Sequence, residues 1–155
     1  MTGTSREPDG DADLAQLRVR GTVSAAAALN GMSGVIAVLS GVQFTTSAAF
    51  HDPLYNVVPW ALVGLGVVQL GLALLVMRNS HGATIALSFL APLITMVALG
   101  WAMLAWTNGF HSFIAVCEIP LAGSAAVLAP FALGPTRRAR DAKRRLQDAG
   151  MDLGF

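Results

Sequence analysis

The stretch that decides the fold is FHSFIAVCEIPLAGSAAVLAPFALGPTRRARDAKRR, residues 110–145. Up to Gly134 it is strongly apolar and carries one formal charge, Glu118. After Gly134 and Pro135, six of the nine residues 137–145 are basic. An apolar run of this length predicts a membrane-spanning helix, and basic residues collect on the cytoplasmic side of such helices. The stretch therefore predicts a membrane span whose C-terminal end faces the cytoplasm.

Charge is distributed unevenly along the rest of the chain. Only 12% of the 155 residues are charged, against about 25% in soluble domains. Between Gly21 and Thr136 the only formal charges are Asp52, Arg78 and Glu118, and the other sixteen lie in the two ends of the chain. A nearly neutral body between charged ends is typical of a polytopic membrane protein. The formal net charge of +1 makes nucleic acid an unexpected partner.

Four apolar segments predict an all-α fold, a bundle of four transmembrane helices joined by short loops. The spans are expected at roughly 22–44, 57–77, 83–106 and 112–133, within a membrane domain of residues 21–134. Residues 1–20 form a polar N-terminal tail, in which Asp13 is expected to cap a short helix leading into the first span. Residues 135–155 form a basic tail that is expected to be helical and to end at Gly150.

The positions of basic and aromatic residues predict the orientation. Arg78 is the only base between spans, in a tight turn at residues 78–82, and basic loops stay in the cytoplasm. Both termini are therefore expected in the cytoplasm, with the protein in the plasma (inner) membrane. The alanine, glycine and arginine bias hints at a bacterial source. The expected headgroup anchors are Arg18, Arg20, Arg78, Arg137, Arg138 and Arg140 on the inner side and Trp60, Trp101 and Trp106 on the outer side.

Small residues and prolines shape the predicted helices. Ser33, Ala37 and Gly41 recur every four residues, so they share one helix face that can approach another helix closely. This pattern predicts association in the membrane, as a homo-oligomer or in a larger complex. Pro92 is expected to kink the third span, with Thr95 helping to satisfy the carbonyl group that the proline leaves free.

Glu118 is the leading candidate for a functional residue. An acid within a span is costly to bury, and is a functional-site hypothesis by default. One interpretation is a proton or ion site formed by Glu118 with Asn30 and Gln69 lining the path. The other is a structural acid that is hydrogen-bonded to Asn30, to Gln69 or to a carbonyl group freed by Pro120. Small residues follow Glu118 on its own face, so that face is expected to pack on another helix.

The remaining polar residues do not predict a cofactor. His51, Asp52 and His111 form a polar cluster expected on the outer face. A metal site needs three or four ligands at fixed geometry. His111 and Glu118 are seven positions apart, about two helical turns, which is too far for them to share an ion. Haem would require histidines within the spans. The single cysteine, Cys117, cannot form an intrachain disulfide.

These features leave three functional hypotheses open, and we recognise no known family in the residues. The first is a non-enzymatic subunit or accessory protein that makes its contacts within the membrane, since no catalytic motif is present. The second is a small channel or transporter that uses Glu118. The third, and weakest, is a membrane enzyme that acts on a lipid or quinone through His51 or His111. Membrane lipids are expected partners in every case, with anionic headgroups at the C-terminal tail.

Overall fold

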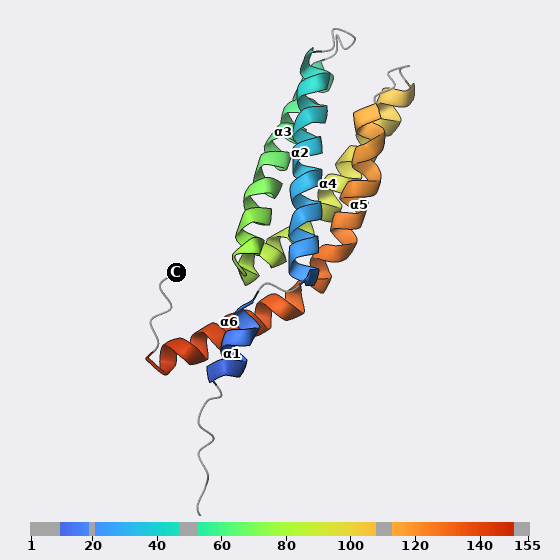
Figure 1. The fold of residues 1–155 in the computed structure, drawn as a ribbon. Coiled ribbons are helices and arrows are strands. Elements are labelled where there is room, and N and C mark those ends of the chain that lie inside the picture. The colour runs from blue at the N-terminus through green and yellow to red at the C-terminus, as the bar shows by residue number, and fades with distance from the viewer. Residues whose placement is uncertain (1–9, 19–20, 47–52, 108–112, 151–155) are drawn as a thin grey trace, which may run out of the picture.

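The computed structural model describes residues 10–18, 21–46, 53–107 and 113–150, and within them the chain is helical apart from short turns, with no strand. The six helices are α1 (Gly10–Leu17), α2 (Gly21–Thr46), α3 (Pro53–Met77), α4 (His81–Thr107), α5 (Phe113–Phe131) and α6 (Leu133–Asp148). Helices α2 to α5 form a long bundle, and α1 and α6 lie together beyond one of its ends (Figure 1). The predicted all-α fold is confirmed.

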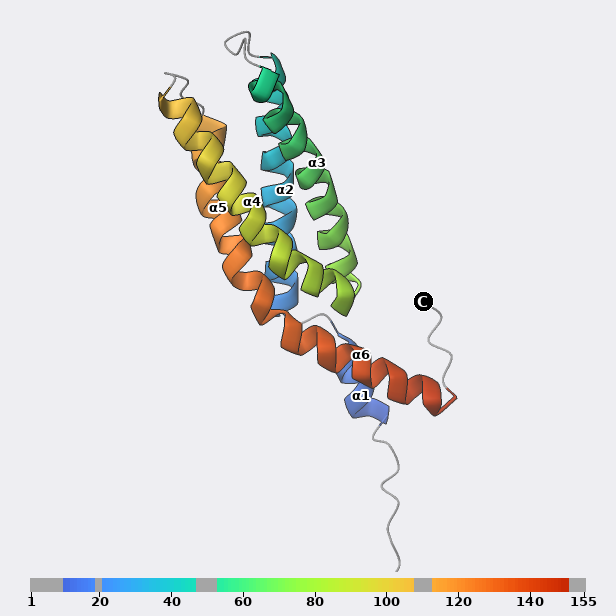
Figure 2. The ribbon, with the colours of Figure 1, turned by 180° about the vertical axis from the view of Figure 1, so that it is seen from behind.

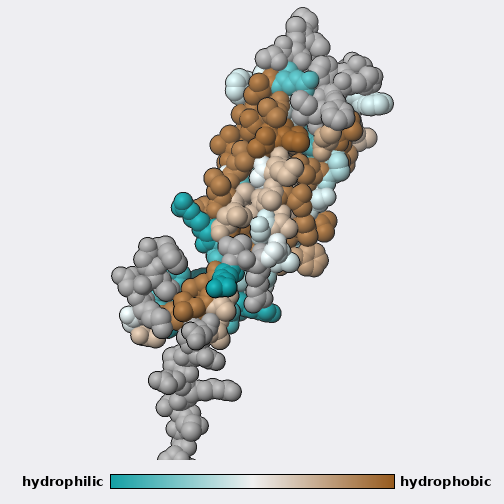
Figure 3. All heavy atoms as spheres, viewed as in Figure 1, coloured by the Kyte–Doolittle hydropathy of each residue, from teal (hydrophilic) through white to brown (hydrophobic). Residues whose placement is uncertain are grey.

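Several of these helices are long and apolar enough to cross a membrane. Three stretches qualify by length and composition, Ala12–Thr45, Val57–Met77 and His81–Met103. A fourth qualifies only when α5 and α6, which meet at a bend of 42°, are taken together as one broken span. Figure 3 shows hydrophobic residues over much of the visible face of the bundle and hydrophilic ones gathered toward α1 and α6. The prediction of several apolar helices is therefore confirmed.

Helices α2 and α3 approach each other closely at glycines. A Cβ atom placed on Gly34 would lie 2.8 Å from the carbonyl oxygen of Gly66, and one on Gly66 would lie 2.7 Å from the carbonyl oxygen of Gly34. Two turns further along α2, a Cβ atom on Gly41 would lie 2.6 Å from the carbonyl oxygen of Pro59. Small residues permit this close packing of helix backbones. The small-residue face predicted on this helix is thus used within the chain.

Helix α5 packs against α2 and α4 through its own small residues. The residues on its inner face that follow Glu118 are Ala122, Ala125 and Ala129, and all are buried. At the end of the bundle where α5 meets α6, the core is a cluster of Val23, Ala26, Ala27, Val76, Ala83, Leu87, Ala129 and Ala132. The side chains are mostly short, so all four long helices can meet there.

Trp101 differs from its expected position at the membrane interface. Its ring is only 4% exposed and packs edge-on against Phe44, with the ring centroids 5.0 Å apart and the planes at 89°. Leu62 completes this cluster. An edge-to-face aromatic pair combines apolar burial with a favourable ring geometry. Trp101 therefore holds α2, α3 and α4 together rather than facing the headgroups.

Helix α4 is visibly bent (Figure 2), and Pro92 lies within it. Proline lacks the N–H that would bond the carbonyl group four residues earlier, here that of Ser88, and its ring pushes that carbonyl away. Thr95 does not supply the missing donor, contrary to expectation, because its hydroxyl donates to the carbonyl oxygen of Ala91 at 2.8 Å. The threonine hydroxyl therefore bonds the carbonyl group four residues before it, and it does not donate to the Ser88 carbonyl.

The bend between α5 and α6 also has prolines on both sides. Pro130 is the penultimate residue of α5 and Pro135 lies in the first turn of α6. Pro135 cannot donate to Phe131, so the continuous helical bonding is interrupted at this point. Beyond the bend α6 is amphipathic, and it buries Thr136, Ala139 and Ala142 together with Leu146. The apolar side of α6 lies against α1, and its start reaches α4 and α5.

Candidate functional site

Polar side chains are buried along one face of α2. Asn30, Ser33 and Ser40 are fully buried, and with Ala37 between them they recur every three or four residues. This spacing places them on the side of α2 that faces the bundle interior. Gln69 of α3 is also fully buried, and Glu118 of α5 is 2% exposed. Two polar sites result, one near each end of this face.

The first site is an amide pair between α2 and α3. Gln69 Nε2 donates to Asn30 Oδ1 at 3.1 Å, and Asn30 Nδ2 donates to the carbonyl oxygen of Ala26 at 2.8 Å. Gly34 and Gly66 lie one turn away from the two amides, so the close backbone approach there brings them within bonding distance. Interhelical bonds of this kind join helices in an apolar environment. Gln69 Oε1 has no partner among the described residues.

The second site is the carboxyl group of Glu118 on α5. The Ser40 hydroxyl of α2 is the polar group that faces it, but neither Ser40 Oγ nor Glu118 Oε1 makes a hydrogen bond of ordinary geometry with the described residues. No ion pair to Glu118 forms within the described part of the chain. A buried polar atom without a partner is costly. The carboxyl group is thus placed in the bundle with capacity to bind something more.

The two sites are separate. Ser40 lies ten residues beyond Asn30 on the same helix, which corresponds to about 15 Å along the axis. Asn30 and Gln69 therefore bond each other, and neither is the partner of Glu118. Among residues 10–18, 21–46, 53–107 and 113–150, no group of three His, Cys, Asp or Glu side chains could hold a metal ion.

The other residues singled out in the sequence fall into two sets. Arg20, His51, Asp52 and His111 lie outside the described residues, so their expected roles stay predictions. Those exposed in the described part of the chain are Arg18, Arg78, Arg137, Arg138, Arg140, Trp60 and Trp106. Trp60 and Trp106 are near the end of the bundle opposite Arg78, as their positions at the start of α3 and the end of α4 require.

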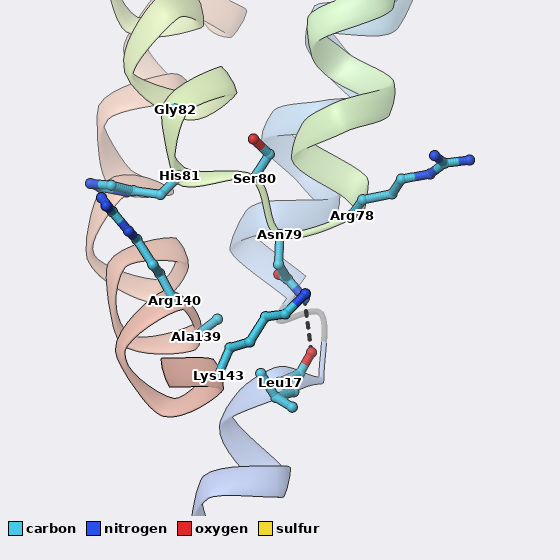
Figure 4. Close-up of a pocket in the computed structure, with 9 residues that line it drawn as sticks. All are labelled: Leu17, Arg78, Asn79, Ser80, His81, Gly82, Ala139, Arg140 and Lys143. Carbon is cyan, nitrogen blue, oxygen red and sulfur yellow. Dashed lines mark hydrogen bonds between the residues drawn. The ribbon is translucent and has the colours of Figure 1, made fainter. Parts of the chain in front are cut away.

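A pocket at the Arg78 end of the bundle is the third candidate site. It lies between the α3–α4 turn, the end of α1 and one side of α6, and its volume is about 980 Å³. The residues that line it are Leu17, Arg78, Asn79, Ser80, His81, Gly82, Ala139, Arg140 and Lys143 (Figure 4). Three bases and a histidine line this pocket, and none of the lining residues that the structure describes is an acid.

Asn79 shapes the turn beside this pocket. It adopts a left-handed backbone conformation with φ of 57°, which asparagine tolerates better than most residues. Its N–H donates to the carbonyl oxygen of Val76 at 2.8 Å, and Ser80 N–H donates to that of Leu75 at 3.0 Å, so the turn ends α3. Asn79 Nδ2 also donates to the carbonyl oxygen of Leu17 at 2.8 Å. One residue thus ends α3 and ties the turn to α1.

His81 is held by α6. The Thr136 hydroxyl donates to the carbonyl oxygen of Ala132 at 2.9 Å. With its proton used in this way, Thr136 Oγ1 can accept a hydrogen bond from His81 Nδ1, which lies 3.2 Å from it. This arrangement requires the proton of the imidazole to be on Nδ1. The contact fixes the orientation of the ring at the edge of the pocket and connects the first residue of α4 to α6.

Asp13 and Arg145 connect α1 to α6. The guanidinium group donates two hydrogen bonds, from Nη2 to Asp13 Oδ1 at 2.7 Å and from Nε to Asp13 Oδ2 at 3.0 Å. Asp13 lies inside α1 rather than before it, so it is not the helix cap expected from the sequence. The hydrogen bond from Arg145 lowers the pKa of the Asp13 carboxyl, and the same bond raises the pKa of Arg145.

We expect the α1–α6 contact to weaken in acid. Since the pKa of Asp13 is lowered in the folded state from 3.8, the stabilisation is fully present above about pH 3.8 and is lost as the pH falls through the lowered pKa. Hydrogen exchange of residues 10–17 in the wild type and the Asp13→Asn variant checks this. At neutral pH the variant should exchange faster, and the difference should disappear in strong acid. A difference that persisted there would contradict the assigned role of the carboxylate.

Several of these contacts carry no signal in the sequence. Asp13 and Arg145 are 132 positions apart, and nothing in their local surroundings indicates their pairing. The hydrogen bond from Asn79 to Leu17 could not be predicted from the sequence either. An asparagine shortly after an apolar helix indicates only that the helix ends there. His81 and Thr136 meet only because the bend between α5 and α6 directs α6 beneath the α3–α4 turn (Figures 1 and 2).

The class that the fold defines is an all-helical bundle with several helices long and apolar enough to span a membrane. No protein family model, curated protein or solved structure matches the chain.

Proposed function

We propose that the chain is an integral membrane protein of the plasma (inner) membrane, that α2, α3, α4 and α5 cross it, and that both termini lie in the cytoplasm. The support is the outer surface of the bundle, which carries many large exposed apolar side chains. They include Met32 on α2, Leu74 on α3, Phe89 and Met96 on α4, and Val127 on α5. Apolar surface this extensive is stable against lipid and unfavourable in water.

The two ends of the bundle support the proposed orientation. Arg78, Arg140 and Lys143 lie at the end where the chain meets α6, and basic residues favour the cytoplasmic side. Trp60 and Trp106 are both exposed near the other end, and tryptophan favours the membrane interface. The segment from His81 to Trp106 extends about 38 Å along α4, which exceeds the hydrocarbon thickness of about 30 Å.

Within the membrane we propose that the protein acts as a non-enzymatic subunit or accessory protein, alone as a homo-oligomer or in a larger complex. The outer face of α3 carries this proposal. Six exposed positions on it are spaced alternately by four and three residues, as in the contact seam of packed helices. They are Val57, Ala61, Gly64, Val68, Gly71 and Leu75.

The glycines of this outer seam are open. A Cβ atom on Gly64 or Gly71 would meet nothing within 4 Å, whereas one on Gly34 or Gly66 would meet a neighbouring backbone. Within the chain, glycines on the α2–α3 contact allow two helices to pack closely. The same residue type at the same kind of spacing on the outer side of α3 fits a helix from another chain.

Substitution of both outer glycines tests this role. We expect the wild type to run as an oligomer, or with a partner, in mild detergent. The double variant Gly64→Leu/Gly71→Leu should run as a monomer with unchanged thermal stability, because leucine blocks the close approach without touching the bundle. Gly100→Leu, at an open glycine of α4 outside the seam, serves as the control and should assemble normally. A wild type that is monomeric and co-purifies with nothing would contradict the proposal.

A second candidate function is a proton or ion pathway through the bundle. It is favoured by the buried polar atoms without a protein partner in the described residues, Ser33 Oγ, Ser40 Oγ, Gln69 Oε1 and Glu118 Oε1. Such atoms find partners in water or in an ion when the protein supplies none. They come from α2, α3 and α5, so the pathway would run between these helices. The substitution Glu118→Gln in proteoliposomes tests this candidate.

A further inference from the structure

The basic pocket beneath the α3–α4 turn is built by three separate parts of the chain. The turn contributes one wall, α6 contributes a second, and the end of α1 closes it at Leu17. Asn79 fixes the turn to α1, and Thr136 fixes His81 to α6. Since these hydrogen bonds connect the walls, the pocket is a feature of the packed structure. Its volume of about 980 Å³ is large enough for a phosphate with the glycerol attached to it.

Two of the three bases in this pocket have no acidic partner among the described residues. Neither Arg78 nor Arg140 forms an ion pair with any carboxylate of the described residues. Arg145, on the other hand, is paired with Asp13. Figure 4 shows the Arg140 side chain pointing toward His81 at one edge of the pocket, with Lys143 pointing toward Asn79 and Arg78 pointing away on the other side. The pocket suits an anion that contacts Arg140 and Lys143.

An apolar surface continues from this pocket along α4. After His81, exposed apolar residues recur on one side of the helix at Ile85, Phe89, Leu93 and Met96, and Phe89 is 76% exposed. The spacing of about four residues keeps them on one side of the helix. A ligand that fits both features has an anionic phosphate at one end and long apolar chains at the other. A free phosphate would use the pocket alone.

We propose that this pocket binds one anionic glycerophospholipid, with its phosphate at Arg140 and Lys143 and its acyl chains along Ile85 and Phe89. The inference rests on the membrane location proposed above. Phosphate forms strong charge-assisted hydrogen bonds with guanidinium and ammonium groups, and the level of the pocket at the end of the bundle matches the level of cytoplasmic headgroups. The bound lipid would join the hairpin turn to α6.

Native mass spectrometry of the full-length protein in mild detergent tests the proposal. The protein is titrated separately with phosphatidylglycerol and with phosphatidylcholine, and the lipids bound are counted. We expect one phosphatidylglycerol to bind more tightly than phosphatidylcholine. The double variant Arg140→Gln/Lys143→Gln should weaken this binding roughly 30-fold, since each base near an anionic headgroup contributes about fivefold.

Matched variants distinguish lipid binding in the pocket from a general attraction of lipid to the positive charge of α6. Arg137→Gln/Arg138→Gln removes the same charge from the same helix outside the pocket, and its affinity for phosphatidylglycerol should stay unchanged. The swap Arg140→Lys/Lys143→Arg keeps the charge and should bind as the wild type does. Equal weakening in the two neutralised doubles, or no preference for phosphatidylglycerol over phosphatidylcholine, would overturn the proposal.

Two further measurements identify the source of any failure. Glycerol 3-phosphate should not displace the bound lipid, and displacement would mean that a soluble phosphate is the ligand, which contradicts the lipid assignment. Washing membranes with alkaline carbonate tests location on its own. Release of the protein would refute the membrane proposal. Retention, combined with equal lipid binding by wild type and Arg140→Gln/Lys143→Gln, would refute only the lipid site.

Discussion

The substitution Gly66→Ala is expected to destabilise the protein by about 1–3 kcal/mol. A Cβ atom at this position would lie 2.7 Å from the carbonyl oxygen of Gly34 and 3.1 Å from the Cβ atom of Ala37. The nearest atom belongs to the backbone of α2, which cannot turn aside as a side chain can. The two helices must therefore move apart. That movement also stretches the hydrogen bond from Gln69 to Asn30 one turn away.

The denaturation midpoint in a mild detergent measures this effect, with Gly100→Ala as the matched control. Gly100 lies in α4 and a Cβ atom there would meet nothing within 4 Å. Alanine favours a helix over glycine by up to about 1 kcal/mol, so the control should be as stable as the wild type or slightly more stable. Equal stability of the two variants would show that α2 and α3 are not in close contact at Gly34 and Gly66.

The second large effect is expected at Glu118, if the buried polar atoms form a pathway. In proteoliposomes under a proton gradient, Glu118→Gln should reduce the flux to the level of vesicles without protein. Glutamine has nearly the same shape and can still form hydrogen bonds, but it cannot release a proton. The loss should therefore occur without a change in assembly or thermal stability. This combination distinguishes a functional acid from a structural one.

Asp148→Asn provides the control for Glu118→Gln. Asp148 is an exposed acid at the end of α6, far along the chain from the polar residues of the bundle, so its substitution should leave the flux unchanged. A wild type with no flux above empty vesicles would remove the pathway, as would a Glu118→Gln variant with wild-type flux. In either case the acid would have a packing role, and the subunit proposal would stand alone.

The overall helical character is predictable because hydropathy acts locally. Each apolar run fixes a helix by itself, even where a proline such as Pro92 or Pro120 lies inside it. The spacing of Ser33, Ala37 and Gly41 also indicates a face that packs closely. The same spacing does not say which helix will cover that face. In the structure α2 uses its small residues against α3 and α5 within the chain, while the open glycines of α3 point outward.

The polar contacts could not be derived in the same way because each depends on the register of two helices. Asn30 and Gln69 are separated by 39 positions, and only the close approach at the glycines brings them together. Glu118 faces Ser40, and the sequence does not distinguish this serine from Ser33 as its neighbour. Trp101 could not be placed from the sequence either. Its position near the end of an apolar run is typical of an interface anchor, but in the structure its ring packs against Phe44.

The bend after α5 determines the rest of the candidate site. Gly134 and Pro135 indicate a break in the sequence, but the direction of the following helix depends on how its buried side fits α1. Once α6 turns beneath the α3–α4 turn, Arg140 and Lys143 come to line the same pocket as His81. The sequence predicts only that the basic tail is attracted to anionic lipid. In the structure the same tail forms one wall of a defined pocket.

Labelling of single cysteines from the two sides of the membrane tests the central claim most directly. Cys117 is first replaced by serine, and a cysteine is then introduced at Arg78 or at Trp106, which lie at opposite ends of the bundle and are both exposed. A maleimide that cannot cross the membrane should label Trp106→Cys in intact cells, and Arg78→Cys only after the membrane is opened. Labelling of both positions from the same side, or a protein that stays soluble without detergent, would contradict the account.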